Sequence, residues 1–209
     1  MIGLDIVSAK AKEELRLERA DIITLVHMAA KAILGEATML YEATVSAFKQ
    51  QLGSLSAIID KAEAFCAAKK IDPSVIISSR LAPDMLPFVR QILIACDFAK
   101  NCSGRLAGGE IPKFEDNEKT FDELKARIAK TLAYLSTLDA KAIDGAAGRI
   151  QEFPIGPNKM KMEISAYALR FALPNFYFHS STAYNILREN GVDLGKRDFM
   201  GQVAGLEAA

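Results

Sequence analysis

The residues best suited to chemistry lie in one segment, Pro174 to Gly191, which reads PNFYFHSSTAYNILRENG. This segment carries His179, one of only two histidines in the chain. Asn175 lies four residues earlier, so a helix places the imidazole and the amide on one face. The same face continues through apolar residues, and we expect it to point into a core. An imidazole beside an amide can line a pocket, form part of an incomplete metal site, or be a hydrogen-bonded core pair.

Motifs of the common enzyme classes are missing from the sequence. It contains no GxxxxGK[ST] loop, no GxGxxG after a strand, no HExxH and no GxSxG. Ser180 and Ser181 adjoin His179 but point to other faces of a helix, so they form no nucleophile–base pair with it. We interpret Asp97, an acid inside an apolar helical stretch, as solvated or paired rather than catalytic. Whether the protein is an enzyme stays open, and the sequence favours a protein without catalysis.

Metal chemistry has little support from the residues alone. A zinc site normally takes three or four protein ligands, and two histidines cannot supply three imidazoles. The three cysteines, Cys66, Cys96 and Cys102, have no CxxC spacing, and we interpret them as free buried thiols in a reducing cytoplasm. We therefore predict no bound cofactor, with zinc or nickel as the less favoured alternative.

Composition narrows the class of protein. The 209 residues are 50% hydrophobic and carry 26 basic and 26 acidic side chains. Balanced charge, with no basic run interleaved with aromatic residues, argues against a nucleic-acid partner. No stretch approaches the roughly 20 apolar residues that span a bilayer, which argues against a membrane protein. We expect a cytoplasmic, soluble protein.

The apolar periodicity predicts four main helices, at about 40–69, 84–107, 120–138 and 164–190. Gly53 is a candidate kink in the first helix and Pro174 in the last, and a T-x-x-E capping box starts the third at Thr120. Residues 149–163 alternate and contain a turn signal, which predicts a short hairpin-like excursion. The sequence therefore predicts an all-α protein, a four-helix bundle with a long crossover, with an irregular chain after Gly195.

The two ends of the chain differ from the predicted bundle domain at residues 39–201. Residues 1–38 are charged and then apolar, which predicts a helical N-terminal extension. Two interpretations stay open: one or two extra helices packed on the domain, or a segment upstream of a translation start at Met39, which we prefer. We expect residues 202–209 to be a disordered tail.

Several blocks of the sequence resemble one known family. Phe171 to Gly201 closely resembles the C-terminal signature of the bacterial domain-of-unknown-function family nineteen-ninety-three. RLAPDM at Arg80–Met85 and KFEDNEKTFDELKARIAKT at Lys113–Thr131 are similar to two further blocks of that family. Met39–Phe48 matches its starting pattern, MxYxAxVxxF. The resemblance covers roughly residues 39–201 and implies the fold of the DinB/YfiT-like metalloenzyme superfamily.

The resemblance also implies positions for a site. Superfamily members include thiol-dependent S-transferases and a maleylpyruvate isomerase, and they hold a divalent ion with three histidines, one on the second helix and an HxxxH pair on the last. By this resemblance His179 falls on the second histidine of the pair, Asn175 on the first, and Gln91 near the second-helix histidine. Two of the three ligands are thus replaced, and neutral amides bind zinc or nickel poorly.

Three functions follow from these considerations. We prefer a DinB-like bundle with a degenerate metal site that binds a small molecule in a pocket around His179, lined also by Asn175 and by Gln91 or Arg80. The first alternative is a metal-dependent enzyme of the DinB/YfiT type, a thiol S-transferase or isomerase, in which His179 is the one matching ligand. The second is a non-catalytic interaction protein. We expect a homodimer.

Overall fold

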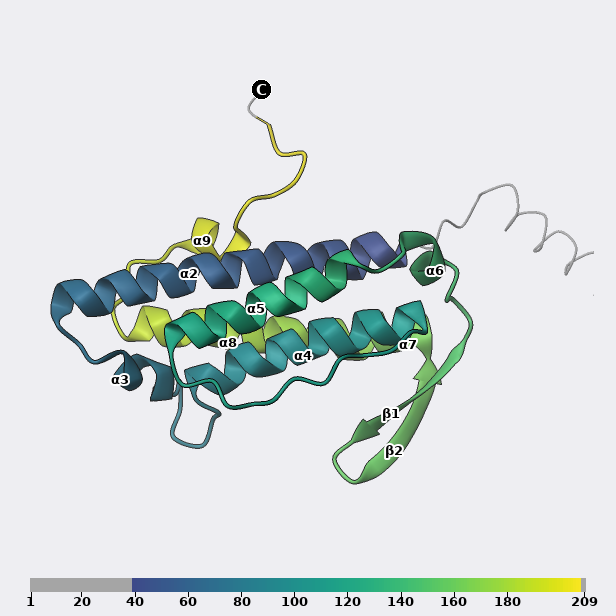
Figure 1. Cartoon of the computed structure of the whole chain (residues 1–209), viewed down its shortest axis with the longest axis horizontal. Helices are drawn as coiled ribbons and strands as arrows, with labels where there is room; N and C mark the ends of the chain where they lie inside the picture. Colours follow the sequence, from purple (N-terminus) through teal and green to yellow (C-terminus); the bar gives the residue numbers. More distant parts are fainter. Residues whose placement is uncertain (1–38, 208–209) are drawn as a thin grey trace, which may run out of the picture. The chain divides into compact units, whose positions relative to one another are not determined.

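The computed structural model describes residues 39–207. The helical extension predicted at residues 1–38 lies outside the described residues, as does the end of the predicted tail, residues 208 and 209. The described chain is mostly helical, with one small sheet, so the predicted helical class is confirmed (Figure 1). In chain order its elements, with η for a π-helix, are η1 (Glu42–Ser46), α2 (Ala47–Lys69), α3 (Pro73–Ser78), α4 (Phe88–Ala107), α5 (Phe121–Ser136), α6 (Ala140–Asp144), β1 (Ile150–Ile155), β2 (Asn158–Glu163), α7 (Ile164–Tyr167), η2 (Ala168–Ala172), α8 (Leu173–Glu189) and α9 (Lys196–Met200).

Four long helices pack in a closed ring. Helix α2 packs against α5, α5 against α4, α4 against α8, and α8 against α2 (Figure 1). Aromatic side chains fill the space between them: the Phe48 and Phe176 rings meet edge to face with centroids 4.7 Å apart. Both rings are fully buried. Burial of one such side chain contributes about 1.5–3 kcal/mol, so these contacts are a main source of the fold's stability.

The predicted helix ends are confirmed where a cap or a glycine marks them. Thr120 and Glu123 form the capping box: the Glu123 amide donates to Thr120 Oγ1 at 3.2 Å, and the Thr120 amide donates to Glu123 Oε2 at 3.0 Å. Helix α4 ends at Gly108, whose φ of 71° is a left-handed conformation that glycine adopts without strain. Gly191, with φ of 90°, follows the end of α8 in the same way.

Other predicted boundaries were wrong. The first helical stretch begins at residue 40 as predicted, but it includes the π-helix η1, and α2 runs through Gly53 without a break. Helix α4 begins at Phe88, with Pro87 as its N-cap, rather than near Pro83–Asp84. The chain after Gly195 is not wholly irregular, because it forms α9. The apolar run in the connection after α2 is helical too, as α3, because the Asp72 carboxylate caps its first turn.

The predicted hairpin excursion is confirmed. Strands β1 and β2 pair antiparallel, with Phe153 opposite Met160 and a turn through Gly156, whose φ is 55°. Phe153 is 5% exposed, and its ring lies 4.5 Å from that of Tyr167 and 5.3 Å from that of Phe171. The hairpin is therefore anchored on the helices by one aromatic side chain.

Pro174 lies in the first turn of α8, directly after the π-helix η2. Proline has no amide hydrogen to donate to the preceding turn, and a π-turn is a common way for a helix to absorb such a defect. The stretch that was predicted as one kinked helix is thus three segments, α7, η2 and α8. This arrangement sets the rotation of the face that carries Asn175 and His179.

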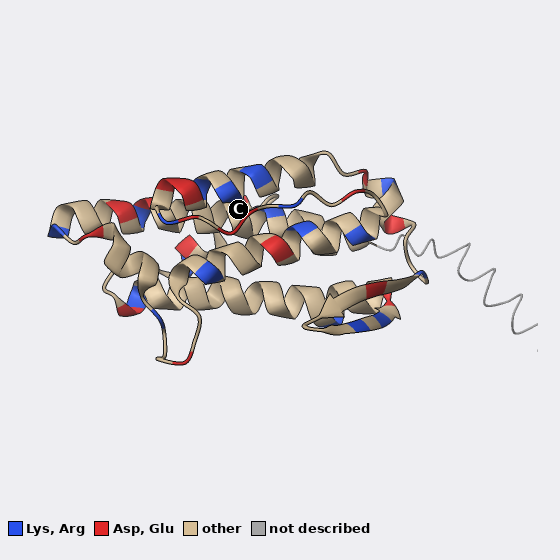
Figure 2. Cartoon of the chain, turned by 60° about the horizontal axis from the view of Figure 1, so that its bottom comes forward, with Lys and Arg blue, Asp and Glu red and all other residues tan. Residues whose placement is uncertain are grey.

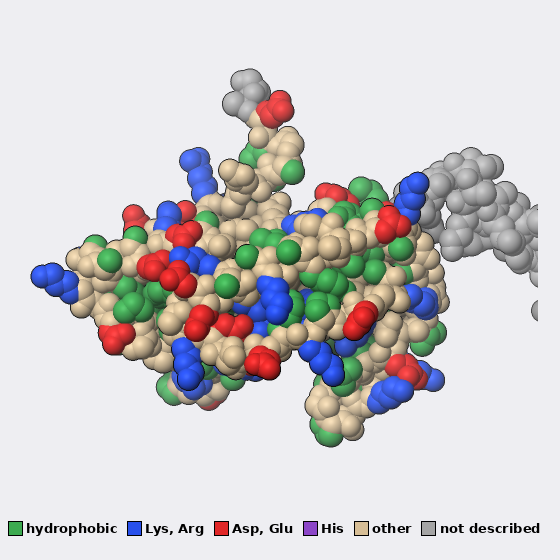
Figure 3. Space-filling view, in the orientation of Figure 1, with side chains coloured by type: hydrophobic (Ala, Val, Ile, Leu, Met, Phe, Trp, Pro, Cys, Tyr) green, Lys and Arg blue, Asp and Glu red, His purple; other side chains and the backbone are tan. Residues whose placement is uncertain are grey.

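Charges of both signs are mixed over the described chain. Figure 2 shows acidic and basic residues interspersed along the helices, and Figure 3 shows their side chains interspersed on the face that it draws. Among the helices that the structure describes, none is both long and apolar enough to cross a bilayer.

A crossover of residues 108–120 joins α4 to α5 and makes these neighbours parallel (Figure 1). Helix α4 has 20 residues and is about 30 Å long. An extended chain covers about 3.3 Å per residue, so 13 residues span up to about 43 Å and are long enough to return along α4. This connection, called the strap below, contains no helix or strand, so side chains must hold it in place.

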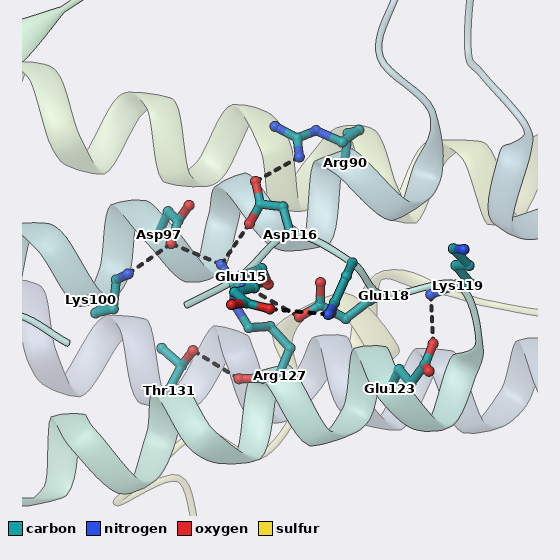
Figure 4. Close-up of polar contacts among 11 residues, drawn as sticks. Arg90, Asp97, Lys100, Glu115, Asp116, Glu118, Lys119, Glu123, Arg127 and Thr131 are labelled. Carbon is teal, nitrogen blue, oxygen red and sulfur yellow. Dashed lines mark hydrogen bonds and ion pairs between the residues drawn. The ribbon is translucent and has the colours of Figure 1, made fainter. Parts of the chain in front are cut away.

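Arg127 of α5 holds the crossover (Figure 4). Its Nη1 donates to the Glu115 carbonyl at 2.8 Å and to the Glu118 carboxylate at 3.0 Å. Its Nη2 donates to the Asp97 carboxylate of α4 at 3.0 Å and to the Asp116 carboxylate at 3.2 Å. The side chain is 2% exposed. One buried cation thus connects α4, α5 and the strap.

We predict that Arg127→Met strongly lowers the free energy of unfolding. Removal of one partner from a buried ion network leaves uncompensated charge and costs about 3–5 kcal/mol. Arg90→Gln is the matched control: Arg90 also pairs with Asp116, at 2.7 Å, but on the surface. Loss of such an exposed pair costs about 1 kcal/mol or less. Urea unfolding of both variants measures the difference, and equal losses would contradict the role given to Arg127.

Candidate functional site

The structure brings Gln91 and His179 into direct contact. They come from α4 and α8, two neighbours in the ring of helices. His179 Nδ1 lies 2.7 Å from Gln91 Oε1. Gln91 is buried, at 1% exposure, whereas His179 is half-buried. The two positions that the resemblance implied on different helices are therefore adjacent in space.

The hydrogen bonds of Gln91 define the tautomer of the imidazole. Gln91 Nε2 donates to the Leu86 carbonyl at 2.9 Å, which turns Oε1 toward His179. An amide oxygen only accepts, so His179 Nδ1 carries the proton and donates. Burial lowers the pKa of His179, which favours the neutral ring at pH 7. Nε2 is then an unprotonated nitrogen able to accept a hydrogen bond.

Aromatic rings surround His179. The Phe98 ring stacks on the imidazole with centroids 6.1 Å apart and planes 18° apart. Phe178 meets it edge-on at 5.2 Å, and this phenylalanine is 55% exposed. The expectation that the whole face points into the core needs correction: Thr182 and Ile186 are buried, but His179 lies at the edge of the core.

Asn175, one turn before His179 on α8, lines a cavity that His179 does not line. Asn175 Nδ2 donates to the Phe171 carbonyl one turn earlier, at 2.8 Å. The cavity, of about 410 Å³, is formed by α4, the hairpin strand β1 and the α7–η2–α8 stretch. Aromatic rings wall this cavity, and its polar lining comes mainly from α4: the aromatic residues are Phe98, Phe153, Tyr167 and Phe171, and the polar α4 residues are Asp97, Asn101 and Arg105. Phe98 connects this cavity to the ring of His179.

Arg80 lies apart from the other three candidates. It is exposed in the connection before α4, and its Nη1 donates to the Met85 carbonyl of that same connection. It is not among the residues that line the Asn175 cavity. Of the four residues predicted for one pocket, Gln91 and His179 thus form a pair, Asn175 lines the neighbouring cavity, and Arg80 braces a loop.

The residues at the positions that the resemblance implies for a metal do not fit a zinc or nickel site. They offer one imidazole nitrogen and two amide groups, and Gln91 Oε1 is already bonded to the imidazole. Amide oxygens are weak ligands for these ions. Within residues 39–207, no group of three or more His, Cys, Asp or Glu side chains is arranged to hold a metal ion.

The cysteines are free and buried, as predicted. Burial raises the pKa of Cys96 and of Cys102 to about 12, so both are protonated thiols at neutral pH. A thiol is a poor nucleophile and a poor metal ligand in that form. Asp97 is an ion-paired acid, since Arg127 Nη2 and Lys100 Nζ lie 3.0 and 3.1 Å from its Oδ1.

Two features of the candidate site escaped prediction from the sequence. The polar lining of the cavity has a signal in the sequence, because Asp97, Asn101 and Arg105 recur every four residues on one face of α4. The aromatic wall formed by Phe153 has none, since only the folded hairpin brings this side chain against the helices.

Comparisons with known proteins find a matching family model and a similar crystal structure. The model of a family described as "Domain of unknown function (DUF1993)" matches residues 40–200. A crystal structure of a DinB family member protein from Shewanella denitrificans is 41% identical in sequence, with a TM-score of 0.77. The match covers 84% of this chain and 99% of that one. No curated protein matches the chain.

We predict that His179 makes stability depend on pH. The unfolded histidine has a pKa of about 6.5, and burial lowers the pKa in the folded state. Below about pH 6.5 the unfolded chain therefore binds a proton that the folded chain resists, and the free energy of unfolding falls with falling pH. His179→Gln removes this contribution.

Urea unfolding of both proteins between pH 7.5 and 5.5 is the measurement. We expect the wild-type protein to lose more stability over this range than the variant loses. Equal losses, or a larger loss in the variant, would show that the His179 pKa is not lowered in the folded state.

Proposed function

This chain belongs to the DUF1993 family, and from that premise we propose that it is a DinB-like four-helix-bundle protein that binds a small organic molecule without a metal ion. The proposed site is the Asn175 cavity together with the Gln91–His179 pair beside it. The homodimer and the cytoplasmic location expected from the sequence stay predictions.

The observation that carries this proposal is the 2.7 Å hydrogen bond between His179 Nδ1 and Gln91 Oε1. It joins two of the three positions at which superfamily members are expected to hold a metal. This hydrogen bond engages the His179 Nδ1 proton and Gln91 Oε1, which leaves Nε2 as the one free imidazole nitrogen. A single nitrogen is far fewer than the three or four protein ligands that a zinc site takes. The pair then has a positioning role: it fixes the imidazole plane, on which the Phe98 wall of the cavity is stacked.

The cavity has the composition of a ligand site. A volume of about 410 Å³ falls within the roughly 300–1,000 Å³ typical of small-molecule pockets. Its aromatic walls offer apolar surface, and Asn101 and Asn175 each offer an amide donor and an acceptor. A few oriented polar groups among aromatic rings are the usual means of recognising one small molecule.

The alternative of a DinB/YfiT-type metalloenzyme has weaker support. Chemistry through a divalent ion needs an open coordination position held by several ligands, and the donor set here is one imidazole and two amides. The protonated thiols of Cys96 and Cys102 add no ligand at neutral pH. We therefore derive no catalytic step for His179.

We predict that aromatic fragments bind in the cavity and that Asn175→Leu weakens them. The variant keeps the branching and the number of side-chain heavy atoms and removes one hydrogen-bonding group. Loss of one hydrogen bond corresponds to about 1–1.5 kcal/mol, or about five- to tenfold in affinity. NMR titration of the protein with a panel of small phenyl compounds measures the dissociation constants and reports which side-chain amides shift.

Ser181→Ala is the matched control, because Ser181 lies on the same helix and does not line the cavity. We expect its dissociation constants to equal those of the wild-type protein. Fragments that bind elsewhere, or that bind Asn175→Leu as tightly as the wild-type protein, would contradict the proposed site.

A further inference from the structure

The cavity beside Asn175 carries a charge pattern that selects a class of ligand. Asp97, Asn101 and Arg105 line it from one face of α4. Eight residues of helix separate the first from the last, which is about 12 Å along the axis. The cavity is therefore elongated, with an acidic side chain near one end, a basic side chain near the other and an amide between them.

Arg105 is the cation without a balancing anion. Its Nη1 donates to the Tyr167 hydroxyl oxygen at 2.9 Å, and its guanidinium carbon lies 5.6 Å from the centre of the Tyr167 ring. Burial raises the pKa of Tyr167 to about 12, so the phenol is neutral and does not balance the charge. Among the described residues no carboxylate pairs with Arg105. A guanidinium has five N–H donors, so most of them are available to a ligand.

Asp97 is balanced by contrast. Its Oδ1 accepts from Arg127 at 3.0 Å and lies 3.1 Å from Lys100 Nζ. Both cations are almost fully buried, with side chains 2% and 6% exposed. Their charges act on Asp97 through an interior that screens them weakly. The uncompensated charge along the cavity is therefore the positive charge of Arg105.

The aromatic walls of the cavity indicate which apolar group the ligand carries. The Phe153 ring lies 5.3 Å from that of Phe171, and the Phe171 ring lies 6.0 Å from that of Phe98. Offset and edge-to-face contacts at 4.5–7 Å are the favourable geometries for aromatic groups, so a further flat ring gains packing energy against this wall. Asn101 and Asn175 add amide groups for polar atoms of the ligand.

We propose that the cavity binds a small aromatic carboxylate, with the carboxylate on the Arg105 guanidinium and the ring against Phe153 and Phe171. The inference rests on the proposed function, that this cavity is the binding site. A carboxylate accepts two parallel N–H bonds from one guanidinium, which fixes the orientation of the ring. The Asp97 end, with its charge balanced, tolerates a neutral polar substituent.

Three probes of the same size test the charge preference: 3-phenylpropanoate, 3-phenylpropanamide and 3-phenylpropylamine. Their dissociation constants come from NMR titration of the full chain, with the side-chain amides of Asn101 and Asn175 as local reporters. We expect the acid to bind at least about tenfold more tightly than the amide, as a charge-assisted hydrogen bond is about twice as strong as a neutral one. The amine is expected to bind most weakly.

Arg105→Gln removes the cation and is expected to abolish the acid's advantage over the amide. Arg170→Gln is the matched control, because it removes the same charge from an exposed position on η2. We expect this control to keep the preference for the acid. The comparison of acid with amide in the unmodified protein decides the question even where Arg105→Gln fails to fold.

The experiment distinguishes a failure of the carboxylate inference from a failure of the proposed binding site. Binding of the amide or the amine in the cavity as tightly as the acid, or an unchanged preference in Arg105→Gln, overturns the carboxylate inference and leaves the small-molecule site standing. If none of the three probes shifts the amides of Asn101 and Asn175, both the inference and the proposed binding site fail.

Discussion

The buried guanidinium of Arg127 connects α4, α5 and the crossover between them. The placement of the candidate site residues depends on this connection. Parallel α4 and α5 require a connection that returns along the bundle, and residues 108–120 do so without a helix or strand. Arg127 bonds to that strap through a backbone carbonyl and two carboxylates, and to α4 through Asp97. Because a buried cation is tolerated only with all these partners present, it favours one placement of the strap and one rotation of α4.

The rotation of α4 about its axis determines which of its residues contact α8 and which line the cavity. One face places Gln91 against His179 of α8. Another carries Asp97, Asn101 and Arg105 into the cavity under the hairpin. Asp97 belongs to both the Arg127 network and the cavity lining, so the ion network and the binding site share a residue. The network that holds the crossover thus also neutralises one end of the cavity and leaves Arg105 as its effective charge.

Local signals in the sequence predicted much of the fold, because caps, glycines and helical periods act through nearby residues. Thr120 with Glu123, Gly108 and the hairpin turn are of this kind. The resemblance to a family predicted that Gln91 and His179 occupy related positions, and the structure places them in contact. The cavity was beyond prediction, since Phe153 reaches it only when the hairpin folds back on the helices. The π-helix before Pro174 has the proline as its one local signal, which predicts a disturbed helix but not a π-turn.

Metal analysis tests most directly whether this chain works without an ion at the Gln91–His179 pair. Protein exposed to zinc and nickel and then dialysed is measured by elemental analysis, alongside a Gln91→His/Asn175→His variant that restores three imidazoles. We predict no stoichiometric metal in the wild-type protein and about one ion per chain in the variant, as three histidines are a sufficient protein ligand set for zinc. One ion per wild-type chain, lost in His179→Ala, would contradict a metal-free site.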